Sequence, residues 1–151
     1  MLFNKQNAVM KKYILPAFTC MLCLSNCNTS KKPVAESAEK SIAGINWYLK
    51  KVYLPSGNLD INSTNAFIRF DAAKNSAGGK GGCNSFGSNY TIQNNSSLSF
   101  KNVFSTKMFC EQFQLQEDAF FKQLEKANRY EVKEGKLLMY ADNDLLLEFG
   151  K

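Results

Sequence analysis

The sequence predicts a mainly β fold of the α+β class: a small antiparallel β-barrel-like or strongly bent sheet with one α-helix. Three observations predict it. Apolar and polar residues alternate along several short segments, as they do in half-buried strands. Turn-forming residues separate these segments. One longer segment lacks Pro and Gly and has the apolar spacing of a helix. Many short strands with tight turns favour a closed or strongly curved antiparallel sheet.

The first half of the domain contains four alternating segments. Their apolar positions are Ile45, Trp47 and Leu49, then Ala66, Ile68 and Phe70, then Tyr90 and Ile92, and finally Leu98 and Phe100. Turn signals rich in Asn, Ser, Gly and Pro fall at 55–58, 74–76 and 94–96. We therefore expect a strand at each alternating segment, with turns between them.

The second half contains the predicted helix and three further strands. Residues 111–127 are rich in helix-forming residues. Their apolar members on one helical face are Phe113, Phe120, Phe121, Leu124 and Ala127. Strand patterns follow at 129–133, 136–141 and 145–149, with a tight hairpin turn expected at Glu134-Gly135 and another turn at Asp142-Asn143.

The glycine-rich segment 78–82 resembles a phosphate-binding loop only superficially. A phosphate loop of the Walker type needs Ser or Thr after its Lys and then a helix. Here Gly81 follows Lys80, and a strand-like pattern comes next. We expect these glycines to act through their conformational freedom and small size, which a tightly bent sheet requires.

The N-terminal segment is typical of an export signal. Lys5, Lys11 and Lys12 precede an apolar run at 13–24, which is shorter than the roughly 20 residues that span a bilayer. A permanent transmembrane helix is therefore the weaker interpretation. The run ends in Leu24-Ser25-Asn26-Cys27, which resembles the bacterial lipobox except at Asn26, where a smaller residue is usual. We expect Cys27 to be lipidated; the alternative is an ordinary signal with an incidental cysteine.

Three regions follow from these signals. Residues 1–26 are a predicted lipoprotein signal peptide, and 27–44 comprise the lipidated Cys27 and a flexible tether without aromatic residues. Residues 45–151 form the predicted domain. Because the residue after Cys27 is Asn28 and not Asp, the sorting rules of other bacteria favour anchoring to the outer membrane, facing the periplasm.

Charge and composition exclude several functions. The chain has net charge +6, and loss of the three lysines in the signal lowers it to +3, so no nucleic-acid partner is expected. There is no histidine, which excludes Ser-His-Asp and Cys-His catalysis. The acidic pairs Glu117-Asp118 and Asp142/Asp144 carry no signal of burial, so carboxylate catalysis is not expected either. We predict no enzyme activity, cofactor or metal site.

The five cysteines separate by region. Cys20 and Cys23 lie in the signal, and Cys27 is the predicted lipid site. Cys83 and Cys110 remain in the domain, where an exported protein favours a disulfide between them. The alternative is two free buried thiols. Two cysteines without histidine supply too few ligands for a closed zinc site.

Two short segments carry a family resemblance. Gly82-Cys83-Asn84-Ser85-Phe86 and Thr106-Lys107-Met108-Phe109-Cys110, in this order after Trp47, are similar to the META domain (HslJ-like) family of bacterial envelope proteins. The resemblance implies a small antiparallel β-barrel-like fold with one helix, and it pairs Cys83 with Cys110. It brings no catalytic residue. The structural motif positions are Trp47, Gly82, Asn84, Phe86, Thr106, Lys107 and Met108.

Physical roles for the motif residues can be predicted. We expect Asn84 to bond neighbouring backbone in a left-handed turn, and Phe86 and Tyr90 to be buried with Trp47. Met108 and Phe109 should fill the core beneath the helix.

The expected function is a non-catalytic binding or structural role in the envelope, linked to envelope or heat stress by the resemblance. We expect a monomer, held at the membrane through Cys27, with an unidentified envelope protein as partner. The alternative is a periplasmic carrier that holds a small apolar ligand in the mouth of a barrel.

Overall fold

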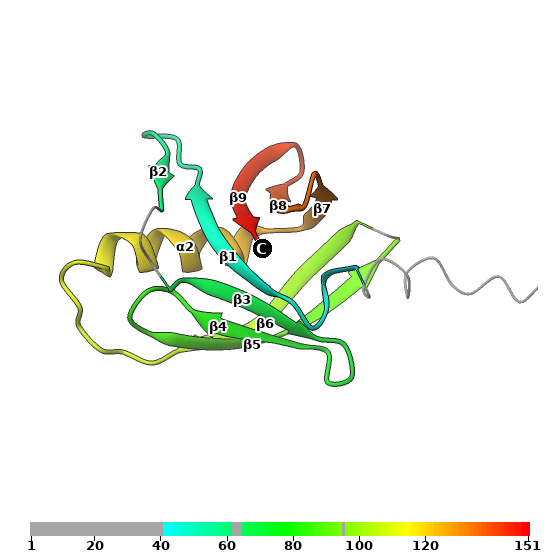
Figure 1. Cartoon of the computed structure of the whole chain (residues 1–151), viewed down its shortest axis with the longest axis horizontal. Coiled ribbons are helices and arrows are strands. Elements are labelled where there is room, and N and C mark those ends of the chain that lie inside the picture. The colour runs from blue at the N-terminus through cyan, green and yellow to red at the C-terminus, as the bar shows by residue number, and fades with distance from the viewer. Residues whose placement is uncertain (1–40, 62–64, 95) are drawn as a thin grey trace, which may run out of the picture. The chain divides into compact units, whose positions relative to one another are not determined.

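The computed structural model describes residues 41–61, 65–94 and 96–151, which form one unit (Figure 1). The predicted signal, Cys27 and most of the predicted tether lie outside the described residues. In chain order the described elements are β1 (Asn46–Val52), β2 (Leu59–Asp60), β3 (Phe67–Asp71), β4 (Ser76–Lys80), β5 (Ser85–Gln93), β6 (Ser97–Ser105), α2 (Gln114–Lys126), β7 (Arg129–Lys133), β8 (Lys136–Ala141) and β9 (Asp144–Gly150). None of the helices in this part of the chain has the length and apolar character needed to cross a bilayer.

The strands form one antiparallel sheet that closes on itself. Its order is β2-β1-β3-β4-β5-β6-β7-β8-β9, and β1 also pairs with β9 from Tyr48↔Gly150 to Val52↔Leu147. Strands β1 and β3–β9 therefore make a ring, with β2 attached at its side. This confirms the predicted mainly β, barrel-like fold with one helix.

The ring has a weak seam that the helix covers. β6 and β7 pair only at Ser97↔Arg129, and α2 is the connection between them. Phe120 of α2 is fully buried, and its ring meets the rings of Phe86 and Phe149 edge-on at 5.5 and 6.1 Å between centroids. The helix thus supplies apolar side chains where the strands separate.

The barrel interior is filled with side chains. Its largest fully buried members include Trp47, Phe70, Tyr90, Phe120 and Phe149, in one continuous core that also contains Phe86. The prediction that Phe86 and Tyr90 are buried in the core with Trp47 is confirmed.

The fold begins before residue 45. Ile42 is fully buried, and its carbonyl oxygen accepts a hydrogen bond of 2.9 Å from Nε1 of Trp47. Ala43 forms a bridge with Phe70, and the N–H of Gly44 donates to the Phe70 carbonyl at 2.9 Å. Residues 41–44, which the composition assigned to the tether, are therefore part of the folded unit.

The glycine-rich segment is mostly strand. Gly78 and Gly79 lie in β4, and a Cβ on Gly79 would collide with the carbonyl oxygen of Phe67 on the neighbouring strand. Gly82 has φ +143°, a conformation that side chains rarely adopt. Close approach and backbone freedom, as predicted, explain these two positions.

Candidate functional site

The two sequence motifs meet where β6 leads into α2. Residues 106–113 connect these elements, and we call this segment the clamped loop. Asn84 lies just before β5, and both the oxygen and the nitrogen of its side-chain amide form hydrogen bonds to the clamped loop. Oδ1 accepts the N–H of Met108 and the hydroxyl of Thr106, each at 2.8 Å, and Nδ2 donates to the Met108 carbonyl at 2.9 Å. One amide side chain therefore pairs with the whole backbone unit of Met108.

This role differs from the one predicted for Asn84. The side chain bonds backbone 24 positions away, not its neighbours. Nor is Asn84 among the non-glycine residues with positive φ, which in the described part of the chain are Asn75, Asn94, Asn102, Glu134 and Asp142. Sequence alone gives the local bonding habits of Asn, whereas this contact depends on the fold that brings β5 and the clamped loop together.

Glu117 holds Asn84 from the other side. Although it is charged, only 2% of it is exposed. Oε1 accepts the main-chain N–H groups of Cys83, at 2.8 Å, and Asn84, and Oε2 accepts Nδ2 of Asn84 at 2.7 Å. A buried carboxylate is costly unless such donors replace water. The expectation that Glu117 is not buried is therefore wrong. The hydrogen bonds of its carboxylate give it a structural role, holding Cys83 and Asn84 in place.

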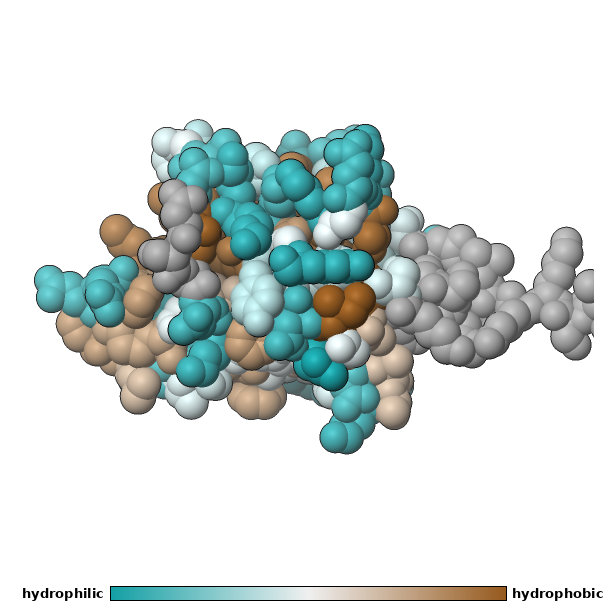
Figure 2. All heavy atoms as spheres, in the orientation of Figure 1, coloured by the Kyte–Doolittle hydropathy of each residue, from teal (hydrophilic) through white to brown (hydrophobic). Residues whose placement is uncertain are grey.

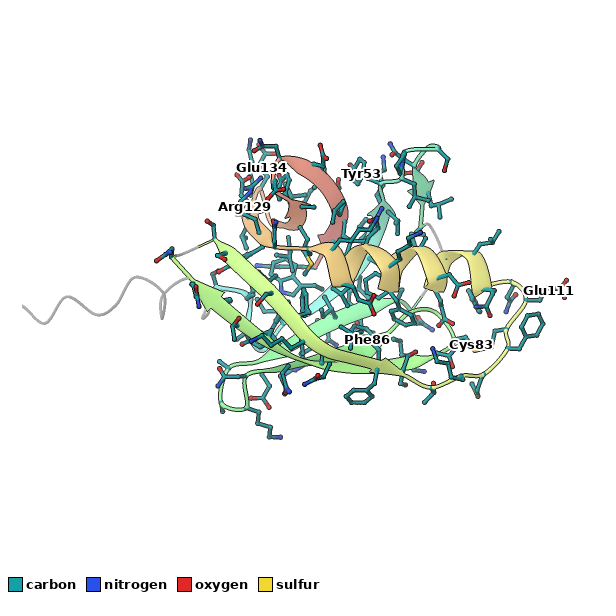
Figure 3. All side chains as sticks on the ribbon, turned by 180° about the vertical axis from the view of Figure 1, so that it is seen from behind. Tyr53, Cys83, Phe86, Glu111, Arg129 and Glu134 are labelled. Atoms are coloured by element: carbon teal, nitrogen blue, oxygen red, sulfur yellow. A yellow bond between two sulfur atoms is a disulfide. The ribbon has the colours of Figure 1, made fainter. Side chains whose placement is uncertain are left out.

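Further bonds tie the clamped loop to the barrel. The disulfide joins Cys83 to Cys110, whose Cα atoms are 6.3 Å apart, as predicted. The N–H of Thr106 donates to the Ser85 carbonyl at 3.0 Å. Just after the loop, Nε2 of Gln116 in α2 donates to the Gly81 carbonyl at 2.7 Å. Figure 3 shows Cys83 inside the curve of the loop and Glu111 at the loop's outer end.

The clamped loop presents apolar side chains to solvent. Met108 is 59% exposed and Phe109 80%, and Leu115 at the start of α2 is also exposed. The prediction that Met108 and Phe109 fill the core is wrong. Asn84 engages the Met108 backbone, and Phe86, Phe120 and Phe121 pack together beneath the helix instead. Figure 2 shows pale brown spheres at the end of the molecule where this loop lies.

A small cavity of about 220 Å³ lies between the clamped loop and α2. Thr106, Lys107, Met108, Phe109 and Asp118 are among its lining residues. The oxygens of Glu117 that line it are engaged by N–H donors, so they are poorly placed to act as a base. The arrangement can present a surface at the end of the domain.

The clamped loop lies far from the point where the described chain begins. Residues 41–44 join the sheet at Phe70, and Figure 1 shows them at the opposite end of the long axis from the loop that follows β6. Residues 41–44 and the clamped loop therefore lie at opposite ends of the described domain.

A polar cluster occupies the outer surface near β8 and β9. Nζ of Lys136 lies 2.8 Å from Oε1 of Glu148, and the hydroxyl of Tyr53 donates to Oε2 at 3.1 Å. The hydrogen bond from Lys136 lowers the pKa of Glu148 from its ordinary value, against the opposing effect of burial. Burial, followed by the bond to Glu148, raises the pKa of Tyr53.

Two solved structures share the fold. An NMR structure of a protein from Burkholderia xenovorans superimposes with a TM-score of 0.61 at 18% identity, covering 96% of this chain and 97% of that one. A second NMR structure superimposes with a TM-score of 0.54 at 16% identity, covering 74% of this chain and 92% of that one. At these identities the likeness concerns the fold alone. No curated protein matches the chain.

The motif residues therefore have a common structural setting: Gly82 to Phe86 and Thr106 to Cys110 form the two sides of one clamp. The META domain matches residues 40–151, which includes both segments and the whole folded unit. The chain belongs to the META domain family.

Proposed function

We propose that this chain is an exported lipoprotein, anchored through Cys27, that works by binding an envelope partner and not by catalysis. The observation that carries the proposal is the clamped loop, which keeps Met108 and Phe109 in solvent at the end of the domain. By the family resemblance, we further propose that its role is linked to envelope or heat stress.

The fixed backbone of the clamped loop supports a binding role, because it keeps the apolar side chains exposed and already ordered. A flexible loop could turn its apolar side chains inward, or would lose conformational entropy on binding. Here the disulfide and the bonds from Asn84 already fix the backbone on both sides of Phe109. Aromatic and Met side chains are enriched in binding surfaces, and preorganisation lowers the cost of using them.

The proposed anchor is compatible with a partner that lies away from the membrane. Residues 28–40 would span at most roughly 45 Å when fully extended. Because the chain enters the domain at the end opposite to the clamped loop, a membrane-anchored domain could direct Met108 and Phe109 towards the periplasm. We propose the outer membrane, periplasmic face, as the location.

The interior of the barrel weighs against the carrier alternative. A carrier needs an apolar cavity for its ligand. The interior instead contains the side chains of Trp47, Phe70, Tyr90 and Phe120, each at least 99% buried. A ligand could enter only by displacing core residues.

The anchor is tested by the variant Cys27→Ser. We expect the wild-type chain to sediment with membranes and to incorporate labelled fatty acid, while Cys27→Ser incorporates no label and keeps the size of the uncleaved precursor. Globomycin, which blocks lipoprotein signal cleavage, should increase the size of the wild-type chain only. A soluble wild-type chain of unchanged size would contradict the anchor.

The binding surface is tested by a photocrosslinking amino acid at position 109 in intact cells. The matched control carries it at Val132, an exposed apolar position on β7. We expect one discrete protein adduct from position 109, lost in a second variant with Met108→Ala, and none from position 132. Adducts of equal pattern at both positions, or crosslinks to lipid alone, would contradict the proposal.

A further inference from the structure

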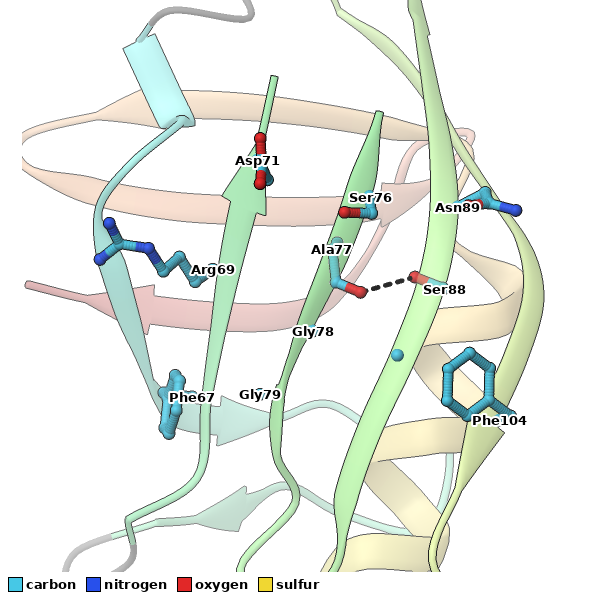
Figure 4. Close-up of a pocket in the computed structure, with 11 residues that line it drawn as sticks. Phe67, Arg69, Asp71, Ser76, Ala77, Gly78, Gly79, Ser88, Asn89 and Phe104 are labelled. Atoms are coloured by element: carbon cyan, nitrogen blue, oxygen red, sulfur yellow. Dashed lines mark hydrogen bonds between the residues drawn. The ribbon is translucent and has the colours of Figure 1, made fainter. Parts of the chain in front are cut away.

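The outer face of β3–β6 has a trough that the clamped loop does not explain. Its volume is about 570 Å³, and Figure 4 shows residues that line it. The floor includes Gly78 and Gly87, which are partners in the ladder between β4 and β5. With no side chain on Gly78, a ligand can approach the sheet backbone directly at that position.

The strand registers place polar side chains along one side of this floor and an aromatic side chain along the other. On one side Asp71, Ser76 and Asn89 are consecutive cross-strand partners, and we call them the polar ladder. On the other side Phe67 lines the trough. The ladder presents a carboxylate, a hydroxyl and an amide at successive strands, about 4.8 Å apart.

An aromatic ring closes the β6 end. Phe104 pairs with Gly87 and is 69% exposed, and a Cβ on Gly87 would come within 2.6 Å of its ring. The ring therefore lies over the glycine, and glycine is the residue that gives it room. At the β3 end, Arg69 occupies the same row as Gly78, Gly87 and Phe104.

A β-bulge places Phe104 on the outside. Along β6 Leu98 is buried, and simple alternation would direct residue 104 to the same side of the sheet. The register between β5 and β6 shifts between Gly87 and Asn89, and Asn102 on the opposing strand has φ +55°. The extra residue reverses the alternation, so that Phe104 faces solvent. Bulges often redirect a side chain in this way near functional sites.

We propose that this trough binds a linear β-linked glycan lying across the strands. Successive sugars of such an extended chain follow one another at close to the strand spacing of roughly 4.8 Å, so they meet successive members of the polar ladder. Its hydroxyl groups can bond Ser76 and Asn89 and the outer side of the Asp71 carboxylate, whose oxygens also hold the N–H groups of Ala73 and Lys74 and the Lys74 ammonium. The C–H face of a sugar can stack on Phe104. The distance from β3 to β6 is about 14 Å, or roughly three sugars.

The same geometry disfavours an extended peptide. Peptides usually bind a sheet by pairing with a free edge, parallel to its strands. β3, β4, β5 and β6 each have a partner on both sides, although β7 pairs with β6 only at Ser97. A peptide crossing the strands would repeat every roughly 3.3 Å per residue, out of step with the ladder. The proposal concerns a different surface from the clamped loop and does not depend on that loop's function.

Titration of the ¹⁵N-labelled domain with chitohexaose, followed by amide NMR, tests the proposal. Maltohexaose, whose α-linkages give a coiled chain, is the matched sugar control. We expect saturable shifts at Gly78 and Gly87 with chitohexaose and much weaker binding of maltohexaose. Phe104→Ala should raise the Kd about tenfold, and Asn89→Ala should raise it several-fold. Val132→Ala, which shortens an exposed apolar side chain on β7, should leave the Kd unchanged.

Both trough variants alter exposed side chains, so their melting midpoints should match that of the wild type. Absence of saturable binding by the folded wild-type domain would overturn the proposal. So would equal affinity for the two sugars, shifts centred on the clamped loop, or a Phe104→Ala variant that binds as well as the wild type.

Discussion

Glu117 bonds Asn84 twice, accepting its main-chain N–H through Oε1 and its side-chain N–H through Oε2. The remaining edge of the same side chain accepts the N–H of Met108. A buried carboxylate thus orients one amide, and that amide fixes a loop on the surface. This series of hydrogen bonds, from Glu117 in the helix through Asn84 to Met108 in the loop, explains why a charged residue occupies the core side of α2.

The first prediction concerns Glu117→Gln. The amide would place an N–H₂ group against N–H donors that now meet a carboxylate oxygen, leaving at least one buried donor unpaired. We expect a loss of about 2–4 kcal/mol in the free energy of unfolding by urea. Asp118→Asn, at the exposed neighbouring position, is the control and should lie within about 0.5 kcal/mol of the wild type. Equal stability of the two variants would argue against this structural role of Glu117.

The second prediction concerns the disulfide. Cys83 and Cys110 are separated by 27 positions, and closing a loop of this length restricts the unfolded chain. The double variant Cys83→Ala, Cys110→Ala should be less stable by about 3.5 kcal/mol on the loop-entropy estimate. The wild type in reducing buffer should approach the same unfolding midpoint. A double variant as stable as the oxidised wild type would show that the bridge does not stabilise the fold.

The third prediction separates the exposed apolar residues from the core. Phe109→Ala should change the unfolding free energy by less than about 0.5 kcal/mol, because the ring is already in water. Phe120→Ala removes a fully buried ring and should cost about 3–5 kcal/mol. Thermal and urea unfolding of both variants measure the contrast. A large loss of stability in Phe109→Ala would place that ring in the core.

The fourth prediction concerns pH. The folded pKa of Glu148 lies below its ordinary value of 4.5, chiefly because Lys136 donates a hydrogen bond to it. The native state therefore binds this proton more weakly than the unfolded chain does. The stabilisation is complete above pH 4.5 and is lost as the pH falls through the folded pKa. Glu148→Gln should have a lower urea midpoint than the wild type at pH 7, and the difference should shrink in acid. A difference that grows as the pH falls would have the wrong sign.

Strands and turns were the most predictable features of the sequence. The closing strands lie within one residue of the predicted 129–133, 136–141 and 145–149, and Glu134 and Gly135 both have the positive φ of the expected hairpin turn. Alternation and turn chemistry are local, so a sequence records them directly. The number and shortness of the strands predicted a barrel-like or strongly bent sheet, whereas the pairing of β1 with β9 that closes it is seen only in the structure.

The candidate site was less predictable because it depends on contacts between distant segments. Met108 and Phe109 lie outside any periodic element, so their apolar character alone suggested burial, whereas Asn84 holds the backbone of Met108 at the surface. Glu117 gave no signal because charged residues are rarely buried without partners. Its spacing in α2 relative to the buried Phe120 and Leu124 was the available indication. The bulge at Asn102 likewise reverses an alternation that sequence alone would continue.

Hydrogen exchange at the amide of Met108 tests the central claim most directly. This residue has an exposed side chain in an irregular loop, yet its N–H donates to Oδ1 of Asn84 at 2.8 Å. The clamp predicts slow exchange at Met108 in the wild type and much faster exchange in Glu117→Gln under conditions where that variant remains folded. Exchange at Met108 as fast as in an unstructured peptide, in the oxidised wild-type protein, would contradict the clamp and the preorganised surface that it supports.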